Sequence, residues 1–508
     1  MMAPTIESSQ LLNLRPAVGF PILLAVVITV YSISSIIYNL FFSPLRKIPG
    51  PKLWAITQVP YLHLMVSGRS HERMRQIHEK YGDVVRVAPD QVAFIDFRAW
   101  KETMGHRRAG QQENGRDPVF YALAKGGVLA PIGSEEHGRQ RRVLSHGFSA
   151  QSMIEQQPLI QKYVDLLMDR LRENGQGGSK ALDMTKWYNW TTFDIIGDLA
   201  FGEPFGCLNE ANYHPWVASL FEGVKQAVNL AVLRRSFPSV GRFFETHLLD
   251  LITPKREQHQ NLTRLKVAKR MNMQVDRPDF MHSMLGKNME GKEKLSLEQI
   301  QANASLLIVA GSETTATALA GATYLLCENP DTLAKLTEEV RYSFSSEDEI
   351  TLLSVQNLKY MLAVLDETLR LFPPVPTSTP RVVHEGGDVI CDTYLPEKTV
   401  VNIWQYVMFR SPKNFALPDS FIPERWLGDP RFVADKKEAF QPFSYGPRNC
   451  VGKNLAYAEM RLILARIIWN FDMKLANNHE GWIDNTEVYT IWDKQPLNVY
   501  LSPRKIGQ

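Results

Sequence analysis

The chain of 508 residues is long enough to bury a sizeable core, and length alone allows two to four domains. A formal net charge of +3, with no basic run interleaved with aromatic residues, argues against nucleic-acid binding. The four cysteines lie far apart with no Cys-x-x-Cys pair, which argues against a zinc site and a disulfide framework and fits a reducing compartment.

An uncharged stretch at 18–42 is long enough, as a helix, to cross the roughly 30 Å hydrocarbon core of a bilayer. A cleaved signal peptide has a shorter apolar region, so an uncleaved anchor is favoured, with an apolar helix docked on the body as the alternative. Arg46, Lys47 and Lys52 follow this stretch, and the positive-inside tendency places the rest of the chain in the cytosol. The sequence therefore predicts a short lumenal segment at 1–17, a transmembrane anchor at 18–42, a Pro-rich linker at 43–55 and a globular body at 56–508.

The body alternates long helical patterns with short strand-like runs. Two β-branched runs, at 84–87 and 91–96, are predicted to form a hairpin around Pro89-Asp90. Helical periodicity dominates from 151 to 371, and short strands and turns are expected at 382–401. These patterns predict a mainly α fold with small β-sheets, of the α+β class.

A long helix is predicted between a capping box at 296–299 and Asn329-Pro330. Inside it, Glu313 is the only charged residue beyond the first and last turns. Gly311 weakens the helix by about 1 kcal/mol relative to Ala, and the Thr314 hydroxyl can bond back to the carbonyl four residues earlier. A weak point beside a lone acid suits proton delivery. The alternatives are a core helix with a surface Glu and a second membrane span, against which its many Ser, Thr and Asn residues argue.

Cys450 lies in the run Phe443-Ser-Tyr-Gly-Pro-Arg-Asn-Cys-Val-Gly452, just before an amphipathic helix predicted from Asn454. The dipole and free N–H groups at a helix N-terminus favour a thiolate, and a single thiolate suits the axial position of a haem iron better than zinc. Glycine lets a flat ligand approach closely. Phe443 can shield the sulfur, and Arg448 can reach a haem carboxylate. The alternative is a buried, inert cysteine beside a turn.

Five positions of this run, Phe443, Gly446, Arg448, Cys450 and Gly452, match the haem-binding loop of the cytochrome P-450 superfamily, which the chain therefore resembles. That superfamily consists of haem-thiolate monooxygenases. The resemblance implies one catalytic domain with the cytochrome P-450 fold at 56–508. It also implies haem b (iron protoporphyrin IX) as the cofactor, with Cys450 as the axial ligand of its iron.

Three further motifs support the resemblance. The run 310–315 is similar to the family's oxygen-activation helix, which implies Gly311 beside the haem and Glu313 and Thr314 as catalytic residues that deliver protons for dioxygen cleavage. Glu367-Thr-Leu-Arg370 is a weak E-x-x-R motif alone, but with Arg425 in a later Pro-Glu-Arg-Trp run it resembles the family's buried structural network.

The third motif is basic. Arginine suits a carboxylate because its planar fork bonds two oxygens. The run from His137 to Arg141 stands where the family usually has Trp-x-x-x-Arg, so Arg141 is expected on a haem propionate and the role of His137 is open. Arg381 resembles another propionate contact. Without the resemblance, the alternative is a solvated basic helix.

Together these motifs predict a monooxygenase that inserts one atom of O2 into a hydrophobic small molecule by hydroxylation, epoxidation or multistep oxidation. Electrons would come from NADPH through a separate NADPH-cytochrome P-450 reductase, since no GxGxxG-type nucleotide site occurs in the chain. Several segments look like filamentous fungal members that tailor terpenoid or polyketide secondary metabolites. The catalytic domain is expected on the cytosolic face of the endoplasmic reticulum membrane.

The substrate pocket is expected to be apolar and to be lined by 110–127, 306–311, 375–379 and 489–492. Two other functions are compatible with a thiolate-ligated haem. One is an isomerase or dehydratase that works without a reductase, and the other is a non-catalytic haem sensor. An intact proton relay at Glu313 and Thr314 argues against both.

Overall fold

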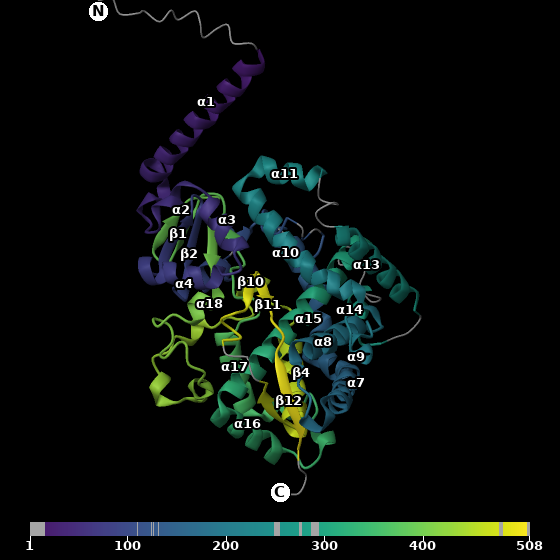
Figure 1. Ribbon diagram of the computed structural model, residues 1–508. Helices are drawn as coiled ribbons and strands as arrows, with labels where there is room; N and C mark the ends of the chain where they lie inside the picture. Colours follow the sequence, from purple (N-terminus) through teal and green to yellow (C-terminus); the bar gives the residue numbers. More distant parts are fainter. Residues whose placement is uncertain are drawn as a thin grey trace, which may run out of the picture.

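The computed structural model describes residues 16–504 except 109, 123, 125, 131, 248–253, 274–276, 286–293 and 477–480. One long helix projects from a mainly helical body that carries small sheets (Figure 1). The α-helices are α1 (Pro16–Ile37), α2 (Lys52–Ile56), α3 (Val59–Val66), α4 (Ser70–Tyr81), α5 (Arg98–Met104), α6 (Ser134–Gly147), α7 (Ala150–Gly175), α8 (Met184–Phe201), α9 (Cys207–Glu210), α10 (Pro215–Ser236), α11 (Pro238–His247), α13 (Pro254–Asn272), α14 (Phe280–Leu285), α15 (Leu297–Glu328), α16 (Pro330–Ser343), α17 (Lys359–Leu371), α18 (Gln405–Phe409) and α19 (Lys453–Asn470).

Short strands form small sheets beside these helices. They are β1 (Val84–Ala88), β2 (Gln91–Phe94), β3 (Gly115–Arg116), β4 (Leu182–Asp183), β5 (Arg381–Val382), β6 (Asp388–Ile390), β7 (Thr393–Leu395), β8 (Val400–Ile403), β9 (Phe471–Leu475), β10 (Glu487–Tyr489), β11 (Ile491–Asp493) and β12 (Asn498–Pro503). The largest sheet has the order β1-β2-β8-β5-β3. In it β1 and β2 are antiparallel, with Ala88 opposite Gln91, which confirms the hairpin predicted around Pro89-Asp90. The predicted short strands at 382–401 are also confirmed, as β5 to β8.

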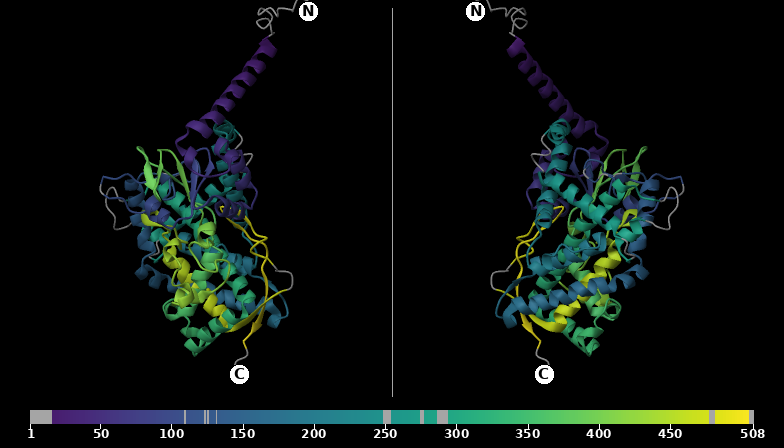
Figure 2. Two further views of the ribbon diagram at one scale, coloured as in Figure 1. Left: turned by 90° about the vertical axis from the view of Figure 1, so that its left-hand side faces the viewer. Right: turned by 90° about the vertical axis from the view of Figure 1, so that its right-hand side faces the viewer.

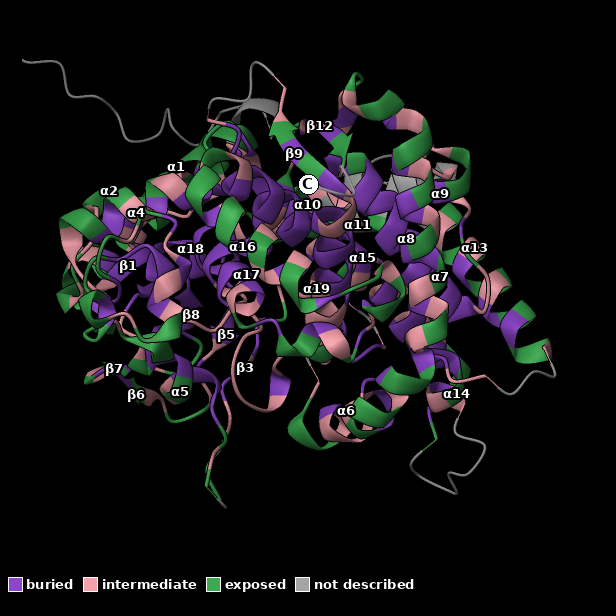
Figure 3. Ribbon diagram, turned by 90° about the horizontal axis from the view of Figure 1, so that it is seen from below, coloured by how far each residue is buried: buried purple, intermediate pink, exposed green. Residues whose placement is uncertain are grey.

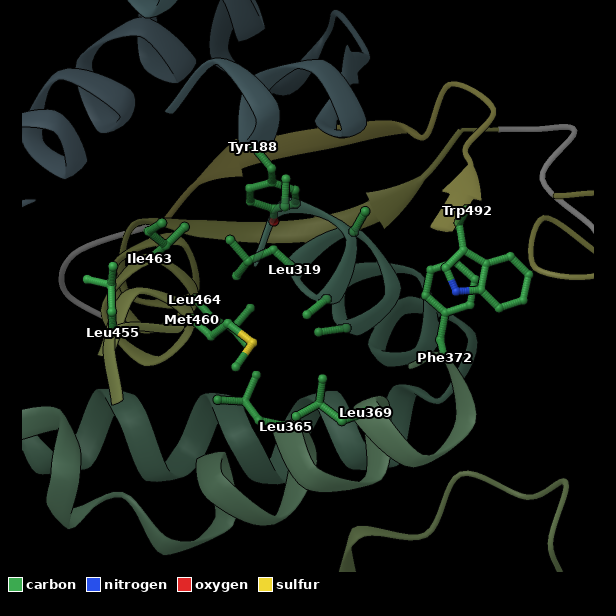
Figure 4. Close-up of a cluster of buried hydrophobic side chains, with 14 of the residues drawn as sticks. Tyr188, Leu319, Leu365, Leu369, Phe372, Leu455, Met460, Ile463, Leu464 and Trp492 are labelled. Carbon is green, nitrogen blue, oxygen red and sulfur yellow. The ribbon is translucent and has the colours of Figure 1, made fainter. Parts of the chain in front are cut away.

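The helix α15 runs through the centre of the body and packs against α8. Both helices are mostly buried, as the purple ribbons of Figure 3 show. The predicted capping box is present: Ser296 accepts from the Gln299 backbone N–H at 3.2 Å, and the Gln299 side chain accepts from the Ser296 N–H at 3.0 Å. Asn329 and Pro330 end the helix as predicted. Beside it, Leu319, Leu365, Met460 and their neighbours form an apolar cluster that joins α15, α17 and α19 (Figure 4).

The projecting helix carries the predicted anchor. Residues 20–42 form a stretch of 23 residues that is long and apolar enough to cross a membrane and is not buried in the body. Two further views show the same helix standing clear of the body (Figure 2). This arrangement is consistent with membrane anchoring. Residues 1–15 of the predicted lumenal segment lie outside the described residues.

The predicted linker at 43–55 is packed rather than loose. Leu45 is buried, and the Pro49 carbonyl accepts from the Arg86 backbone N–H at 2.8 Å. The buried Arg86 side chain donates to the Asn39 carbonyl at 2.9 Å, to the Asn39 side chain at 3.0 Å and to the Ser43 hydroxyl at 3.3 Å. The end of the anchor segment is therefore joined to the first sheet by one arginine of β1.

This joint predicts a difference between two truncated chains. A chain that begins at residue 38 keeps the Asn39 and Ser43 partners of Arg86, whereas one that begins at residue 44 loses them. Since hydrogen bonds to a charged group contribute about 1.5–3 kcal/mol, the shorter chain should have a free energy of unfolding lower by about that amount. Urea unfolding of both chains measures this. Equal stabilities, or the same difference in an Arg86→Met background, would contradict the assignment.

Candidate active site

A cavity of about 290 Å³ lies between α15 and the loop that precedes α19. The helix α15 contributes Leu306, Ala310 and Thr314 to its lining, and the loop before α19 contributes Cys450. Most of the remaining lining is apolar, including Val128, Leu129, Ile196, Leu369 and Val375. The thiol and the oxygen-activation segment predicted from the sequence therefore line one cavity.

Short-range contacts shape the cysteine loop. A single 3₁₀ turn spans Gly446–Arg448, and the Cys450 N–H donates to the Phe443 carbonyl at 2.8 Å. Gly446 has a φ of 75°, and a Cβ there would lie 1.8 Å from the Met104 carbonyl oxygen, so no other residue fits. At Gly452 a Cβ would meet its neighbours at ordinary distances of 3.8–3.9 Å, so the described protein atoms alone do not require glycine there.

The Cys450 thiol lies just before α19, which begins at Lys453 with Gly452 as its N-cap. Cys450 is open to the cavity, but desolvation by the protein packed around it raises the pKa of its thiol above the ordinary value, while the Gly452 N–H, Arg141 and Lys453 act in the opposite direction. The surroundings therefore hold a thiolate only when a further positive charge compensates its burial, and a bound metal cation does this because it deprotonates a coordinating thiol outright.

Four arginines line the same cavity: Arg116, Arg141, Arg381 and Arg448. Sequence reasoning missed Arg116, because no motif marks it. The β3–β5 ladder places it directly opposite Arg381. Like charges opposite each other in a sheet are destabilising unless something compensates them. Burial lowers the pKa of Arg116 to about 10 and also lowers the pKa of Arg141 and of Arg381.

The hydrogen bonds of these cations leave room for an anionic ligand. Arg141 donates to the Asn449 side chain at 2.8 Å, and Arg448 pairs with Glu113, but Nη1 of Arg448 is buried without a partner. His137 is also buried, and its Nε2 has no partner. Burial and the nearby arginines lower its pKa to about 3, so it is a neutral imidazole at pH 7. These residues fit a haem, because its two propionates supply the negative charge that the buried cations lack.

The α15 residues divide between the cavity and its far side. Thr314 lines the cavity, and its hydroxyl donates to the Ala310 carbonyl at 2.7 Å, as predicted. Gly311 also lines it, but a Cβ there would lie 2.7 Å from Ile196, so glycine also serves the close packing on α8. Glu313 does not line the cavity: it is buried and paired with Lys494, a partner that sequence reasoning missed. Burial raises the pKa of Glu313, although Lys494 opposes this shift.

The predicted pocket segments are found only in part. Residues of 110–127, 306–311 and 375–379 line the cavity, among them Tyr121, Leu306 and Thr379. None of 489–492 does, so that expectation is wrong. The Trp492 indole instead turns into the core, stacks on Phe372 at 4.3 Å between ring centroids and donates to the Pro373 carbonyl at 2.7 Å.

The structure brings together the three residues predicted to form a buried network. Arg370 donates to both carboxylate oxygens of Glu367, at 2.8 and 2.9 Å, and Arg425 donates to one of them at 3.0 Å. Two further members, Trp426 and Asp435, were not predicted. The Trp426 indole donates to Glu367 at 3.0 Å, and Asp435 pairs with Arg425 at 2.5 Å. Two carboxylates thus balance two guanidinium groups inside the protein.

Removing one member of this balanced set should be costly. Arg425→Met leaves Glu367 and Asp435 with too little positive charge in a buried place, and breaking a buried pair costs roughly 3–5 kcal/mol. The free energy of unfolding in urea should fall by about that amount. Arg431→Met, which removes an exposed ion pair with Asp429 nearby, is the control and should change little. A loss at Arg425 no larger than at Arg431 would contradict the network's structural role.

Comparison with known proteins agrees with this geometry. The family model described as Cytochrome P450 matches residues 48–499. A trichothecene C-15 hydroxylase of Fusarium sporotrichioides is 45% identical over 475 residues, which cover 93% of this chain and 96% of that protein. An averantin hydroxylase of Dothistroma septosporum is 44% identical, with 94% and 90% covered. The cytochrome P450 monooxygenase tpeC of Talaromyces stipitatus is 45% identical, with 99% and 97% covered.

The domain match, the fold and the relatives agree over nearly the whole chain. A mainly helical body, a cysteine loop and a threonine-bearing helix around one cavity are what the sequence motifs predicted. This chain belongs to the cytochrome P450 family and is one of its monooxygenases.

Proposed function

We propose that this protein inserts one oxygen atom from O2 into a hydrophobic small molecule of fungal secondary metabolism, with haem b held in the cavity described above. The observation that carries the proposal is that Cys450 and Thr314 line a single cavity together with four arginines. Relatives named as hydroxylases of trichothecene and averantin support the reaction class. The substrate class that we propose is terpenoid or polyketide.

Each part of the cavity has a separate task in this proposal. The Cys450 thiolate binds the haem iron, and Arg116, Arg141, Arg381 and Arg448 hold the propionates with His137 as a neutral neighbour. Bound haem supplies the iron that activates dioxygen. The Thr314 hydroxyl borders the cavity and holds a proton donor there. Phe443, in contact with the Tyr457 ring at 5.2 Å between ring centroids, covers the cysteine side and limits water there.

The lining of the cavity indicates the kind of substrate. Apolar side chains from several elements, α8, α15 and α19 among them, make up most of its wall, so burial of apolar surface supplies most of the binding energy. The hydroxyls of Tyr121 and Thr379 are among the few polar groups on the wall that are neither charged nor on α15. A largely apolar molecule that carries an oxygen function fits this distribution.

We also propose that electrons come from NADPH through a separate NADPH-cytochrome P-450 reductase that docks on the cysteine side. A hollow beside the loop that holds Cys450 is lined by Lys101, His106 and Lys453, and also by Asp366. Basic side chains suit an acidic partner. Arg139, on α6, is paired with Glu136 at 2.7 Å.

The location that we propose is the endoplasmic reticulum membrane, with the body on the cytosolic face. The exposed apolar stretch at 20–42 and the basic residues Arg46, Lys47 and Lys52 after it support this orientation. In sealed microsomes, added protease should digest the body. Protection of the body would contradict the orientation.

Replacing Cys450 tests the haem site. Cys450→Ala removes the only thiol among the described residues that line the cavity, so productive haem binding should be lost. The reduced wild-type protein with carbon monoxide should show the red-shifted Soret band of a thiolate-ligated haem. Cys327→Ala, on the far part of α15, is the matched control and should keep that band. If Cys450→Ala also keeps it, Cys450 is not the iron ligand.

The reaction class is tested by Thr314→Ala in a reconstituted system. The wild type should need both NADPH and the reductase, and with labelled O2 it should form a product that carries one labelled oxygen atom. Without the hydroxyl, more of the reduced oxygen should leave as hydrogen peroxide, so the ratio of product to NADPH consumed should fall. Proton-transfer assistance is worth roughly 10²–10⁴-fold, and water in the cavity should reduce the loss below that range.

Candidate terpenoid and polyketide intermediates, screened by product mass, supply the substrate for this experiment. Ser312→Ala removes a hydroxyl that bonds back to the Ile308 carbonyl on the same helix without touching the cavity lining, and its coupling is compared with that of Thr314→Ala. Product formed without reductase would favour an isomerase or dehydratase, and unchanged coupling in Thr314→Ala would contradict the proton-delivery role.

A further inference from the structure

One stretch of the wall of the active-site cavity belongs to no helix or strand. This wall segment, residues 126–130, lies between β3 and α6 and brings Val128 and Leu129 to the lining of the cavity. Val128 is buried, and the backbone N–H and C=O groups of a buried residue need hydrogen-bond partners, which a helix or a sheet would otherwise supply. The partners of the wall segment therefore decide where this part of the wall lies.

Both backbone groups of Val128 are held by buried side chains. The N–H donates to Oδ1 of Asn303 on α15 at 2.8 Å, and the carbonyl accepts from the guanidinium of Arg116 on β3. Asn303 is completely buried, and Arg116 lines the active-site cavity. The position of Val128 is thus set from one side by α15 and from the other side by an arginine of the cavity.

The amide of Asn303 is itself oriented by a second amide. Its Nδ2 donates to Oε1 of Gln140 on α6 at 3.2 Å, which leaves Oδ1 to accept from Val128. Gln140 is also buried, and its Nε2 donates to the Gly126 carbonyl at 3.2 Å and to Glu136 at 2.8 Å. Two buried amides from two helices therefore hold the wall segment, one at Val128 and the other at Gly126.

The wall segment lies directly on α15. A Cβ at Gly127 would lie 3.1 Å from Oδ1 of Asn303 and 3.4 Å from the backbone of Ala302, so glycine lets the two backbones come this close. Packing alone does not require an amide at position 303, because a buried amide costs free energy unless it is hydrogen-bonded. The amide differs from an apolar side chain in that it holds one particular N–H at one particular place.

A second cavity, of about 450 Å³, borders the same segment. Gly127 and Ala130 line the second cavity, whereas Val128 lines the active-site cavity. Leu129, together with Leu306 of α15, lines both. The rest of the second cavity is formed mainly by α13 and α15. The wall segment is therefore part of a partition between two spaces, and a displacement of this segment would join them.

We infer that Asn303 is a positioning residue for substrate size: by holding Val128 in place, it keeps the active-site cavity separate from the second cavity and so limits the bulk of the molecule that the active site accepts. The inference rests on the proposed function, because it concerns the molecule bound beside the haem. Asn303 is not among the described residues that line either cavity, so it acts through Val128. A bulky molecule that displaces the partition must break the bond between Asn303 and Val128, whereas a small molecule leaves that bond intact.

Two imidazoles of different size test this inference on the full-length, haem-loaded protein. Phenylimidazole is small, and clotrimazole carries a bulky triarylmethyl group. Each coordinates haem iron through nitrogen, so its binding is followed by the shift of the Soret band. Since one hydrogen bond changes an equilibrium by up to about tenfold, clotrimazole should bind about tenfold tighter to Asn303→Ala than to the wild type, with little change for phenylimidazole.

Gln140→Met removes the hold on Gly126 and should change the affinity for clotrimazole in the same direction. Because both amides hold one segment, the effect of the double variant with Asn303→Ala should be smaller than the sum of the two single effects. Thr323→Val is the matched control. It removes a buried hydroxyl, bonded to the Tyr188 hydroxyl at 2.6 Å, from a distant part of α15, and it should leave both affinities unchanged.

Hydrogen exchange of the same haem-loaded protein measures the wall segment without any added ligand. Peptides that span 126–130 should exchange about tenfold faster in Asn303→Ala and in Gln140→Met than in the wild type, since the loss of a buried bond promotes local opening. Thr323→Val should exchange like the wild type in these peptides. A merely structural role of Asn303 would speed exchange throughout the body and would leave the ratio of the two imidazole affinities unchanged.

Failure of this inference can be told from failure of the proposed function. Equal changes in the affinity for both imidazoles in Asn303→Ala, or additive effects of the two amide variants, would overturn the inference while the haem site stands. A wild-type protein that shows no Soret shift with either imidazole would overturn the proposed haem site, and the inference with it. Should Asn303→Ala not fold, Gln140→Met carries the comparison, and an unchanged ratio of affinities in that variant would overturn the inference.

Discussion

The centre of this protein is organised around one constraint. It buries more positive charge than negative charge. Arg116 and Arg381 face each other across two short strands, and Arg141 and Arg448 reach the same cavity from a helix and from the cysteine loop. Glu113 offsets part of this charge, on Arg448. The rest needs an anionic ligand, and the two propionates of a haem have the chemistry to supply it in the cavity that Cys450 also lines.

The Glu367 network shows the opposite solution within the same fold. There the buried arginines are matched by carboxylates from the chain itself, so the charges are balanced before any ligand arrives. The charges of the Glu367 network are therefore balanced within the folded chain, whereas those of the arginine-lined cavity are balanced only with a bound cofactor. The Glu367 network holds the segment before the cysteine loop in place. The arginine-lined cavity beside that loop is where the cofactor would bind.

Local signals explain most of what the sequence predicted. The capping box of α15, the hairpin around Pro89-Asp90 and the spacing from Phe443 to Gly452 depend on residues close together in the chain. The partners that were missed come from afar: Lys494 is 181 residues from Glu313, and the opposition of Arg116 and Arg381 exists only in a strand register. From the sequence, the glycines were also explained only by the close approach of a flat ligand. Gly446 is required by the Met104 carbonyl, and a Cβ at Gly311 would crowd the end of the Ile196 side chain, so in both places contact within the protein adds to the argument from a flat ligand.

The contact between Arg86 and the end of the anchor segment has a consequence for how the body meets the membrane. A body on a flexible tether would sample many orientations, whereas a helix joined to the first sheet by hydrogen bonds at 2.9–3.3 Å cannot swivel freely. The helix α11 lies at the same end of the body as this joint (Figure 1), with Phe237, Val240 and Phe243 exposed on and beside it. The angle between the anchor helix and the body is thus set by a contact inside the protein, which would also determine the face of the body that meets a lipid surface.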